Sequence, residues 1–127
     1  MSKSGKNFTK LLILRQICRK ISIMKFKDFQ GREVSLSDEV WAHIKASHPE
    51  ISEADISDTL RDPIEVRQSS QSANVELYYA IKSKEPKLRY KNVIVKSTQA
   101  GYFISSAMTT SSMKKGLTIF KKNEAEE

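Results

Sequence analysis

The sequence predicts an α+β domain in which two helices pack on one face of a curved antiparallel sheet of four to five strands. Between Val40 and Leu60, apolar residues recur every three or four positions, which is the period of a helix. Beyond Pro63 that period is replaced by alternation of apolar and polar residues, which is the period of a strand. A run of helices followed by a run of strands is typical of an α+β domain.

A short hairpin is expected ahead of the helices. Phe26 and Val34 lie in two short alternating segments, and Gly31 lies in the turn between them. The hairpin leads directly into the first helix.

The first helix is expected to begin after Ser37 and to end near His48. Ser37 is a natural N-cap, because its hydroxyl can accept a hydrogen bond from an amide of the first turn. Val40, Ile44 and His48 recur at four-residue spacing and line one stripe of this helix. Pro49 disfavours helical geometry at the residue before it. A histidine is therefore predicted at a helix end, on or near the inward face.

A second helix follows after only a few residues. Ser52 and Asp55 have the spacing of a capping box, and Ile56 and Leu60 form an apolar stripe. The helix ends ahead of Pro63. Strand candidates then follow at 64–69, 75–82, 90–96, 102–109 and 117–120.

Length and composition indicate one soluble domain. The chain has 127 residues, 39% of them apolar, which is enough to bury a core without disulfides or a structural metal. Its single cysteine, Cys18, cannot form an internal disulfide, so a reducing compartment, the cytoplasm, is expected. No apolar run approaches the roughly 18–20 residues of a membrane span.

The formal charge of +7 is distributed unevenly along the chain. Residues 1–27 carry +8, residues 28–65 carry −7, residues 66–122 carry +9, and residues 123–127 carry −3. An acidic first half and a basic second half would give the folded domain one face suited to phosphates.

The charge and hydropathy patterns divide the chain into a basic extension (1–23), a domain (24–122) and an acidic tail (123–127). The extension has three interpretations: a loosely packed or disordered segment ahead of a start at Met24, an amphipathic helix that contacts anionic lipid or nucleic acid, or an organelle-targeting peptide. A secretory signal is excluded, because the apolar region Leu11 to Leu14 is too short.

The sequence predicts neither a metal nor another cofactor. His43 and His48 are five residues apart, which on a helix points them about 140° apart. No cysteine or carboxylate spacing completes a metal site, and the chain has no glycine-rich phosphate loop or Gly-x-Ser-x-Gly motif.

Metal-free RNA cleavage fits the remaining residue types. It needs proton transfer to and from oxygen, and cations for the phosphate. The candidates are His48 for proton transfer, Arg67 and Lys96 for phosphate, Tyr78, Tyr79 and Tyr102 for base stacking, and Ser106 or Thr110 for hydrogen bonds. Each type also has an ordinary structural explanation: a histidine at a helix end is often a packing residue, Tyr79 is in phase with core positions, and lysines on strands are usually solvated.

Several segments, in order, resemble a known family. They are Phe26 to Ile44, Ser47-His-Pro-Glu50, Thr59 to Ser69, Leu77-Tyr-Tyr79, Val93-Ile-Val-Lys96 and Lys114-Lys-Gly116. Together they resemble phage-type Barnase–EndoU–colicin–RelE-like nuclease domains, and the resemblance covers Met24 to about Phe120.

The resemblance implies a barnase/RelE-like fold, metal-independent ribonuclease activity and a toxin or phage-conflict setting. RNA is then the expected ligand, and an antitoxin or immunity protein an expected partner. The family's site residues fall on His43, His48, Arg67, Ser69 and Lys96.

Two departures from the family pattern favour an alternative. Ala80 stands where relatives usually have arginine, and Met108 stands where they usually have tyrosine. Ser106 replaces a threonine and keeps the hydroxyl. The alternative is a catalytically degenerate module that binds RNA or a protein.

Overall fold

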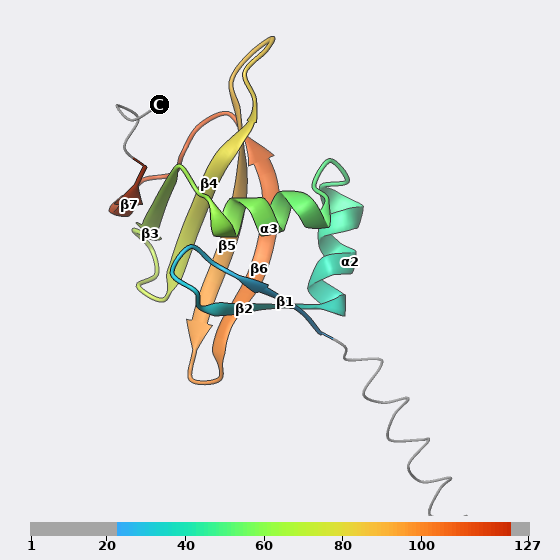
Figure 1. Cartoon of the computed structure of the whole chain (residues 1–127), viewed down its shortest axis with the longest axis vertical. Helices are drawn as coiled ribbons and strands as arrows, with labels where there is room; N and C mark the ends of the chain where they lie inside the picture. The colour runs from blue at the N-terminus through green and yellow to red at the C-terminus, as the bar shows by residue number, and fades with distance from the viewer. Residues whose placement is uncertain (1–22, 123–127) are drawn as a thin grey trace, which may run out of the picture.

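One seven-stranded sheet dominates the protein. The structure is a computed structural model that describes residues 23–122. Of these residues, 50% lie in strands and only 19% in two short helices. The strands are β1 (Ile23–Lys27), β2 (Glu33–Ser37), β3 (Glu65–Ser69), β4 (Val75–Ser83), β5 (Arg89–Thr98), β6 (Gly101–Thr110) and β7 (Gly116–Lys121). The helices are α2 (Asp38–Ser47) and α3 (Glu53–Arg61) (Figure 1).

The expected fold, two helices on a four- to five-stranded antiparallel sheet of barnase/RelE type, is wrong about the sheet. The strand order is β1-β2-β6-β5-β4-β3-β7, so the N-terminal hairpin joins the same sheet as the later strands. Strand β2 pairs in parallel with β6, through Val34 with Tyr102 and Ser35 with Phe103. The sheet is therefore mixed. Alternation along a segment identifies a strand but not its distant partner, so this pairing could not be read from the sequence.

Local capping determines where the helices begin and end, as predicted. The hydroxyl of Ser37 accepts a hydrogen bond from the Val40 amide at 3.2 Å. Ser52 and Asp55 form the predicted capping box, with both reciprocal bonds present. His48 is the C-cap of α2, immediately before Pro49.

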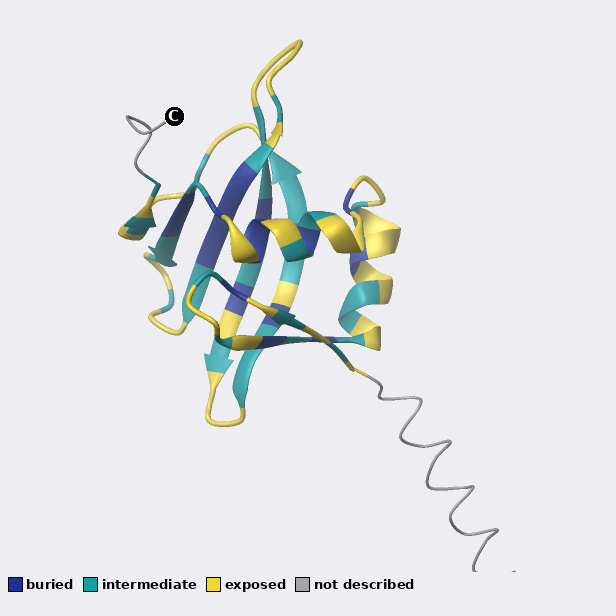
Figure 2. Ribbon diagram, in the orientation of Figure 1, coloured by how far each residue is buried: buried dark blue, intermediate teal, exposed yellow. Residues whose placement is uncertain are grey.

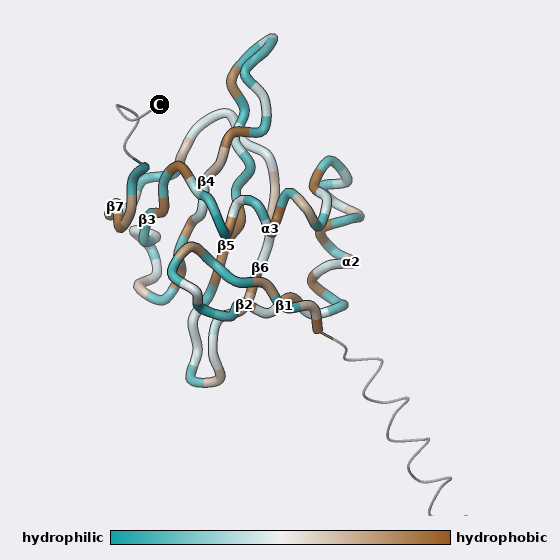
Figure 3. Tube along the Cα trace, viewed as in Figure 1, coloured by the Kyte–Doolittle hydropathy of each residue, from teal (hydrophilic) through white to brown (hydrophobic). Residues whose placement is uncertain are grey.

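The core lies between the helices and one face of the sheet (Figure 1). Figure 2 shows buried stretches of the central strands beneath the helices, and Figure 3 shows hydrophobic and hydrophilic residues alternating along the chain. The buried residues that form this core are Val34, Leu36, Ile44, Ile51, Ile56, Leu60, Val66, Tyr78, Val93, Val95, Ile104 and Ala107. We call the face of the sheet that packs against the helices the helix-covered face, and the opposite face the open face.

The segment 111–115 lies against the open face. The backbone amide of Lys114 donates a 2.9 Å hydrogen bond to the Tyr79 hydroxyl oxygen. The carbonyl oxygen of Lys114 accepts a 2.8 Å bond from Arg67 Nη1. Two side chains of the open face therefore hold this segment at Lys114.

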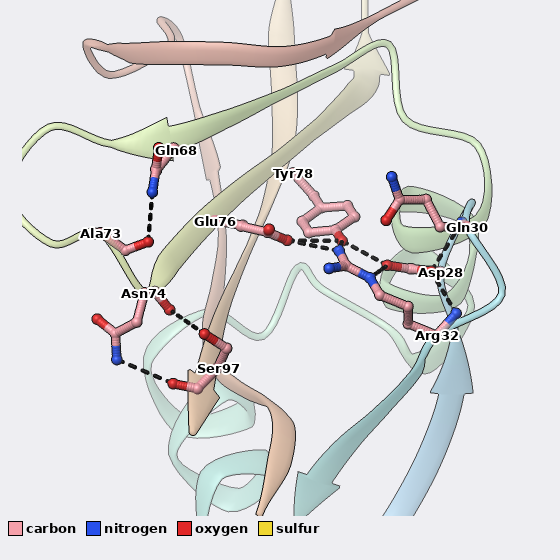
Figure 4. Close-up of polar contacts among 9 residues, drawn as sticks. All are labelled: Asp28, Gln30, Arg32, Gln68, Ala73, Asn74, Glu76, Tyr78 and Ser97. Atoms are coloured by element: carbon pink, nitrogen blue, oxygen red, sulfur yellow. Dashed lines mark hydrogen bonds and ion pairs between the residues drawn. The ribbon is translucent and has the colours of Figure 1, made fainter. Parts of the chain in front are cut away.

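A buried polar network fastens the β1–β2 turn to the centre of the sheet (Figure 4). Asp28 Oδ2 accepts 2.8 Å bonds from Arg32 Nε and the Tyr78 hydroxyl. Arg32 Nη2 also donates to Glu76 at 2.8 Å. Burial alone would raise the pKa of Asp28, but the bonds from Tyr78 and Arg32 outweigh it and hold that pKa below its ordinary value. Burial and the bond to Asp28 raise the pKa of Tyr78, so the phenol stays protonated at neutral pH.

Within residues 23–122, no helix is long and apolar enough to cross a membrane. The expected extension falls on residues 1–23, of which residues 1–22 lie outside the described part of the chain; Ile23 begins β1. The expected acidic tail, residues 123–127, also lies outside it.

Candidate nucleic-acid interface

His48 is partly accessible at the end of α2. Its side chain is 33% exposed, and its Nδ1 lies 3.7 Å from Oε2 of Glu50. Pro49 separates the two residues and ends the helix, so both side chains belong to the short connection between α2 and α3. One carboxylate oxygen of Glu50 thus lies beside Nδ1 of the His48 ring.

Glu50 is held in place by strand β6. Thr109 Oγ1 donates a 2.9 Å hydrogen bond to Glu50 Oε2, and Arg89 Nη2 donates a 3.0 Å bond to Thr109 Oγ1. Burial would raise the pKa of Glu50, but backbone hydrogen bonds, the Thr109 bond and the charge of His48 outweigh it and lower that pKa. Glu50 is therefore a carboxylate anion at neutral pH.

Lys82 of β4 reaches the same connection, and Lys91 of β5 reaches the first turn of α3. Lys82 Nζ donates to the Glu50 carbonyl oxygen at 3.3 Å and to Asp55 Oδ2 at 3.2 Å. Lys91 Nζ lies 3.5 Å from the other Asp55 oxygen. We define the His48 cluster as His48, Glu50, Lys82, Arg89 and Thr109.

The His48 cluster combines a proton-transfer group with cations. The Glu50 oxygen is 3.7 Å from Nδ1, beyond hydrogen-bond distance, so its negative charge favours, but does not fix, a ring with Nδ1 toward the carboxylate and Nε2 toward a reacting group. Arg89 and Lys82 place two cations around the same connection, where they can neutralise charge on a phosphate. Both the His48 and Lys82 side chains are 33% exposed, so a polymer can reach them.

Most residues predicted for the site lie on the open face instead. The residues of this group are Arg67, Ser69, Tyr79, Lys96, Ser106 and Thr110. Side chains alternate along a strand, and the neighbours of these residues belong to the core of the helix-covered face. His43 is exposed on α2. The structure does not bring His48 into one cleft with these six residues.

The predicted open-face residues are also spread out. Arg67 and Ser106 share one register row, through Leu77 and Ile94, with strands β4 and β5 between them. At about 4.8 Å per strand, this places them roughly 14 Å apart. Arg67 Nε is engaged by Glu65 at 2.6 Å. Lys96 is exposed, next to Phe103 in the register.

Tyr79 is a buried residue of the open face rather than an exposed stacking platform. Its side chain is 0% exposed, and its ring makes an edge contact with Tyr90 at 6.2 Å between centroids. Burial raises its pKa, although the hydrogen bond from the Lys114 backbone counters part of the effect. A base cannot stack on Tyr79 unless segment 111–115 moves.

Two hollows border segment 111–115 on the open face. One, of about 460 Å³, is lined by residues that include Arg67, Tyr90 and Met113. The other, of about 410 Å³, includes Ser69 and Lys115 among its lining residues. These hollows contain Arg67 and Ser69 but none of the other predicted residues.

The sequence interpretation missed four members of the His48 cluster: Glu50, Lys82, Arg89 and Thr109. A signal existed for three of them. Glu50 follows His48-Pro49, and Lys82 and Arg89 belong to the basic second half of the chain. No local signal marks Thr109, because its face depends on the register of β6, and the sequence predicts its neighbour Thr110 instead.

Within residues 23–122, no three His, Cys, Asp or Glu side chains gather closely enough to hold a metal ion. No protein-family model, curated protein or solved structure matches the chain.

Proposed function

We propose that the protein binds RNA at the His48 cluster and cleaves it without a metal ion. One observation carries this proposal: the accessible His48 has its Nδ1 beside the Glu50 carboxylate while Lys82 and the Thr109-bound Arg89 border the same connection. A proton-transfer group with an orienting anion and adjacent cations is the set that phosphodiester cleavage by a 2′-hydroxyl requires.

His48 acts on the proton of the attacking hydroxyl. Its Nε2 takes the proton from the 2′-oxygen as that oxygen forms a bond to phosphorus. The bond from phosphorus to the 5′-oxygen breaks, the leaving oxygen takes a proton from water, and the hydroxide so formed takes the proton from His48 Nε2. The products are a 2′,3′-cyclic phosphate and a 5′-hydroxyl. Lys82 and Arg89 stabilise the negative charge that grows on the phosphate oxygens.

The family resemblance of the sequence supports the same chemistry, because the histidine before Pro49-Glu50 is its matching position. A toxin or phage-conflict role, with an antitoxin or immunity protein that covers the site, accompanies the resemblance. A cytoplasmic location fits the single cysteine.

Cleavage of total RNA in EDTA tests the proposal. The wild-type chain should cleave, His48→Ala should not, and His43→Ala should cleave like wild type because His43 is exposed on α2, outside the cluster. Equal cleavage by wild type and His48→Ala, or none by either, would contradict the catalytic role.

A non-catalytic RNA-binding module is the second candidate. The observation that favours it is Ala80, which stands where the resembling domains usually have arginine and whose register neighbour on β5 is Lys91. A methyl group cannot bind phosphate at that position. This candidate predicts salt-sensitive RNA binding without turnover.

A further inference from the structure

The hairpin between β4 and β5 projects from the end of the sheet beyond the core (Figure 1). Residues Lys84 to Leu88 of this hairpin are all exposed, and the tip is hydrophilic in Figure 3. We call residues 82–89 the β4–β5 arm. Its sequence, KSKEPKLR, contains four cations and one acid.

Lysines occur in the β4–β5 connection, residues 84–88, and in neither of the two connections that flank it along the chain; the β6–β7 connection, residues 111–115, also contains two. The connection between β3 and β4, residues 70–74, reads SQSAN, and the turn between β5 and β6, residues 98–101, reads TQAG. Neither contains a charged residue. The connection itself has two lysines and one glutamate, and Lys82 and Arg89 at the adjoining strand ends raise the net charge of the arm to +3, which suits an anionic partner.

The two cations nearest the tip are available to such a partner. Among residues 23–122, neither Lys84 nor Lys87 takes part in an ion pair, whereas Lys82 is paired with Asp55. Ion pairing within the chain therefore does not account for the two lysines.

The arm begins at the His48 cluster. Lys82 contacts the Glu50 carbonyl, and Arg89 reaches Glu50 through Thr109. Lys84 and Lys87 each lie two residues further toward the tip, about 7 Å along an extended chain. That step is close to the separation of neighbouring phosphates in an extended nucleic-acid strand. The four cations thus form two short rows that lead away from His48.

We propose that the β4–β5 arm binds the phosphates of single-stranded RNA on one side of the bond that the His48 cluster cleaves. This inference rests on the proposed function and adds the substrate class and the path of the strand. A single strand fits because its phosphates can follow a narrow projecting arm, and because an unpaired nucleotide is free to place its 2′-hydroxyl in line with the leaving oxygen.

Binding to an uncleavable RNA separates the arm from catalysis. The probe is a fluorescently labelled, unstructured 2′-O-methyl RNA of about 20 nucleotides, whose anisotropy is followed across a salt series. The double variant Lys84→Ala/Lys87→Ala should bind at least roughly tenfold more weakly at low salt, and its salt slope should fall by about 1.4, or 0.7 for each lost phosphate contact. Circular dichroism and thermal melting check that the exposed arm substitutions leave the fold intact.

Two matched variants remove the same charge elsewhere. Lys25→Ala/Lys27→Ala, on the edge strand β1, should bind like wild type. Lys114→Ala/Lys115→Ala tests the open face; if it weakens binding and the arm variant does not, the proposal is overturned. Binding of a matching duplex as tightly as the single strand would also overturn it.

Cleavage of unmodified RNA distinguishes failure of the arm from failure of the proposed function. Arm-dependent binding without any cleavage supports the arm and contradicts catalysis at His48. Cleavage by wild type, together with unchanged binding by the arm variant, contradicts the arm and leaves catalysis at His48 in place.

Discussion

Thr109 donates a 2.9 Å hydrogen bond to the carboxylate of Glu50, a residue 59 positions earlier in the chain. This bond ties the connection between the two helices to strand β6. It also holds the carboxylate beside His48, so the proposed site depends on a contact between the acidic and basic halves of the sequence.

Replacing Thr109 by valine should lower RNA cleavage more than it lowers stability. The substitution keeps the shape but removes the bond to Glu50, so kcat should fall by roughly tenfold or more. The free energy of unfolding should fall by about 1 kcal/mol or less, because the Glu50 side chain is partly solvated. Steady-state kinetics and urea unfolding measure both. Thr110→Val, on the opposite face, is the control, and an equal loss of kcat in it would argue against the assigned role of Thr109.

Replacing Tyr78 by phenylalanine should destabilise the fold without changing the chemistry. Asp28 is 4% exposed and would lose one of its donors, which should cost roughly 1–3 kcal/mol of unfolding free energy. Cleavage by the folded fraction should match wild type, since Tyr78 lies outside the His48 cluster. Urea unfolding and activity at low temperature separate the two effects. A loss of kcat with unchanged stability would place the Asp28 network in the active site.

Stability should fall on the acid side of neutral pH. The folded-state pKa values of Asp28, Glu50, Asp55 and Glu65 are below their ordinary values of 3.8 for Asp and 4.5 for Glu. A lowered carboxyl pKa contributes stability above the unfolded pKa, and that contribution is lost as pH falls through the folded pKa. The free energy of unfolding, measured in urea from about pH 7 to about pH 2.5, should therefore be constant near neutral pH and fall below about pH 4.5.

The variant Asp28→Asn separates the contribution of the Asp28 network from that of the other three carboxylates, Glu50, Asp55 and Glu65. Its free energy of unfolding should be lower than that of wild type at neutral pH and should decrease less on acidification. If the free energy of unfolding decreased by the same amount at low pH in both proteins, Asp28 would not contribute to the loss of stability in acid.

Replacing Gly116 by alanine should weaken the outer edge of the sheet. A Cβ at this position would overlap the backbone carbonyl oxygen of Gln68 on β3, and backbone cannot move aside cheaply. The free energy of unfolding should fall by roughly 1–3 kcal/mol in urea unfolding, while Ser70→Ala, at an exposed loop position, should be neutral. An unchanged free energy in Gly116→Ala would show that β7 is not held as tightly against β3 as described.

Local signals in the sequence predicted the helices and their ends. Ser37, the Ser52 and Asp55 pair, and Pro49 act within a few residues of their own positions, so the sequence around them is sufficient. The sheet depends on contacts between distant segments. The parallel pairing of β2 with β6 joins the hairpin to a strand that begins more than sixty residues later, and no local pattern specifies it.

The same limit applied to the site. The position of His48 at a helix end follows from Pro49, and it was predicted. The cations near it depend on which face each strand residue occupies. The pairing of β5 with β6 shifts register between Ile94 and Val95. Alternation alone does not predict which face each residue occupies beyond such a shift. The sequence therefore indicated Ser106 and Thr110, although Thr109 is the hydroxyl that reaches the connection beside His48.

Single-turnover cleavage of one RNA in EDTA by His48→Gln and Ser106→Ala tests the central claim most directly, because His48 lies at the end of α2, on the helix-covered side of the sheet, and Ser106 lies on the open face. If the chemistry occurs at the His48 cluster, His48→Gln should lower the rate by roughly a hundredfold or more, and Ser106→Ala should leave it within about twofold of wild type. A large loss in Ser106→Ala with an unchanged rate in His48→Gln would contradict the account and place the reaction on the open face.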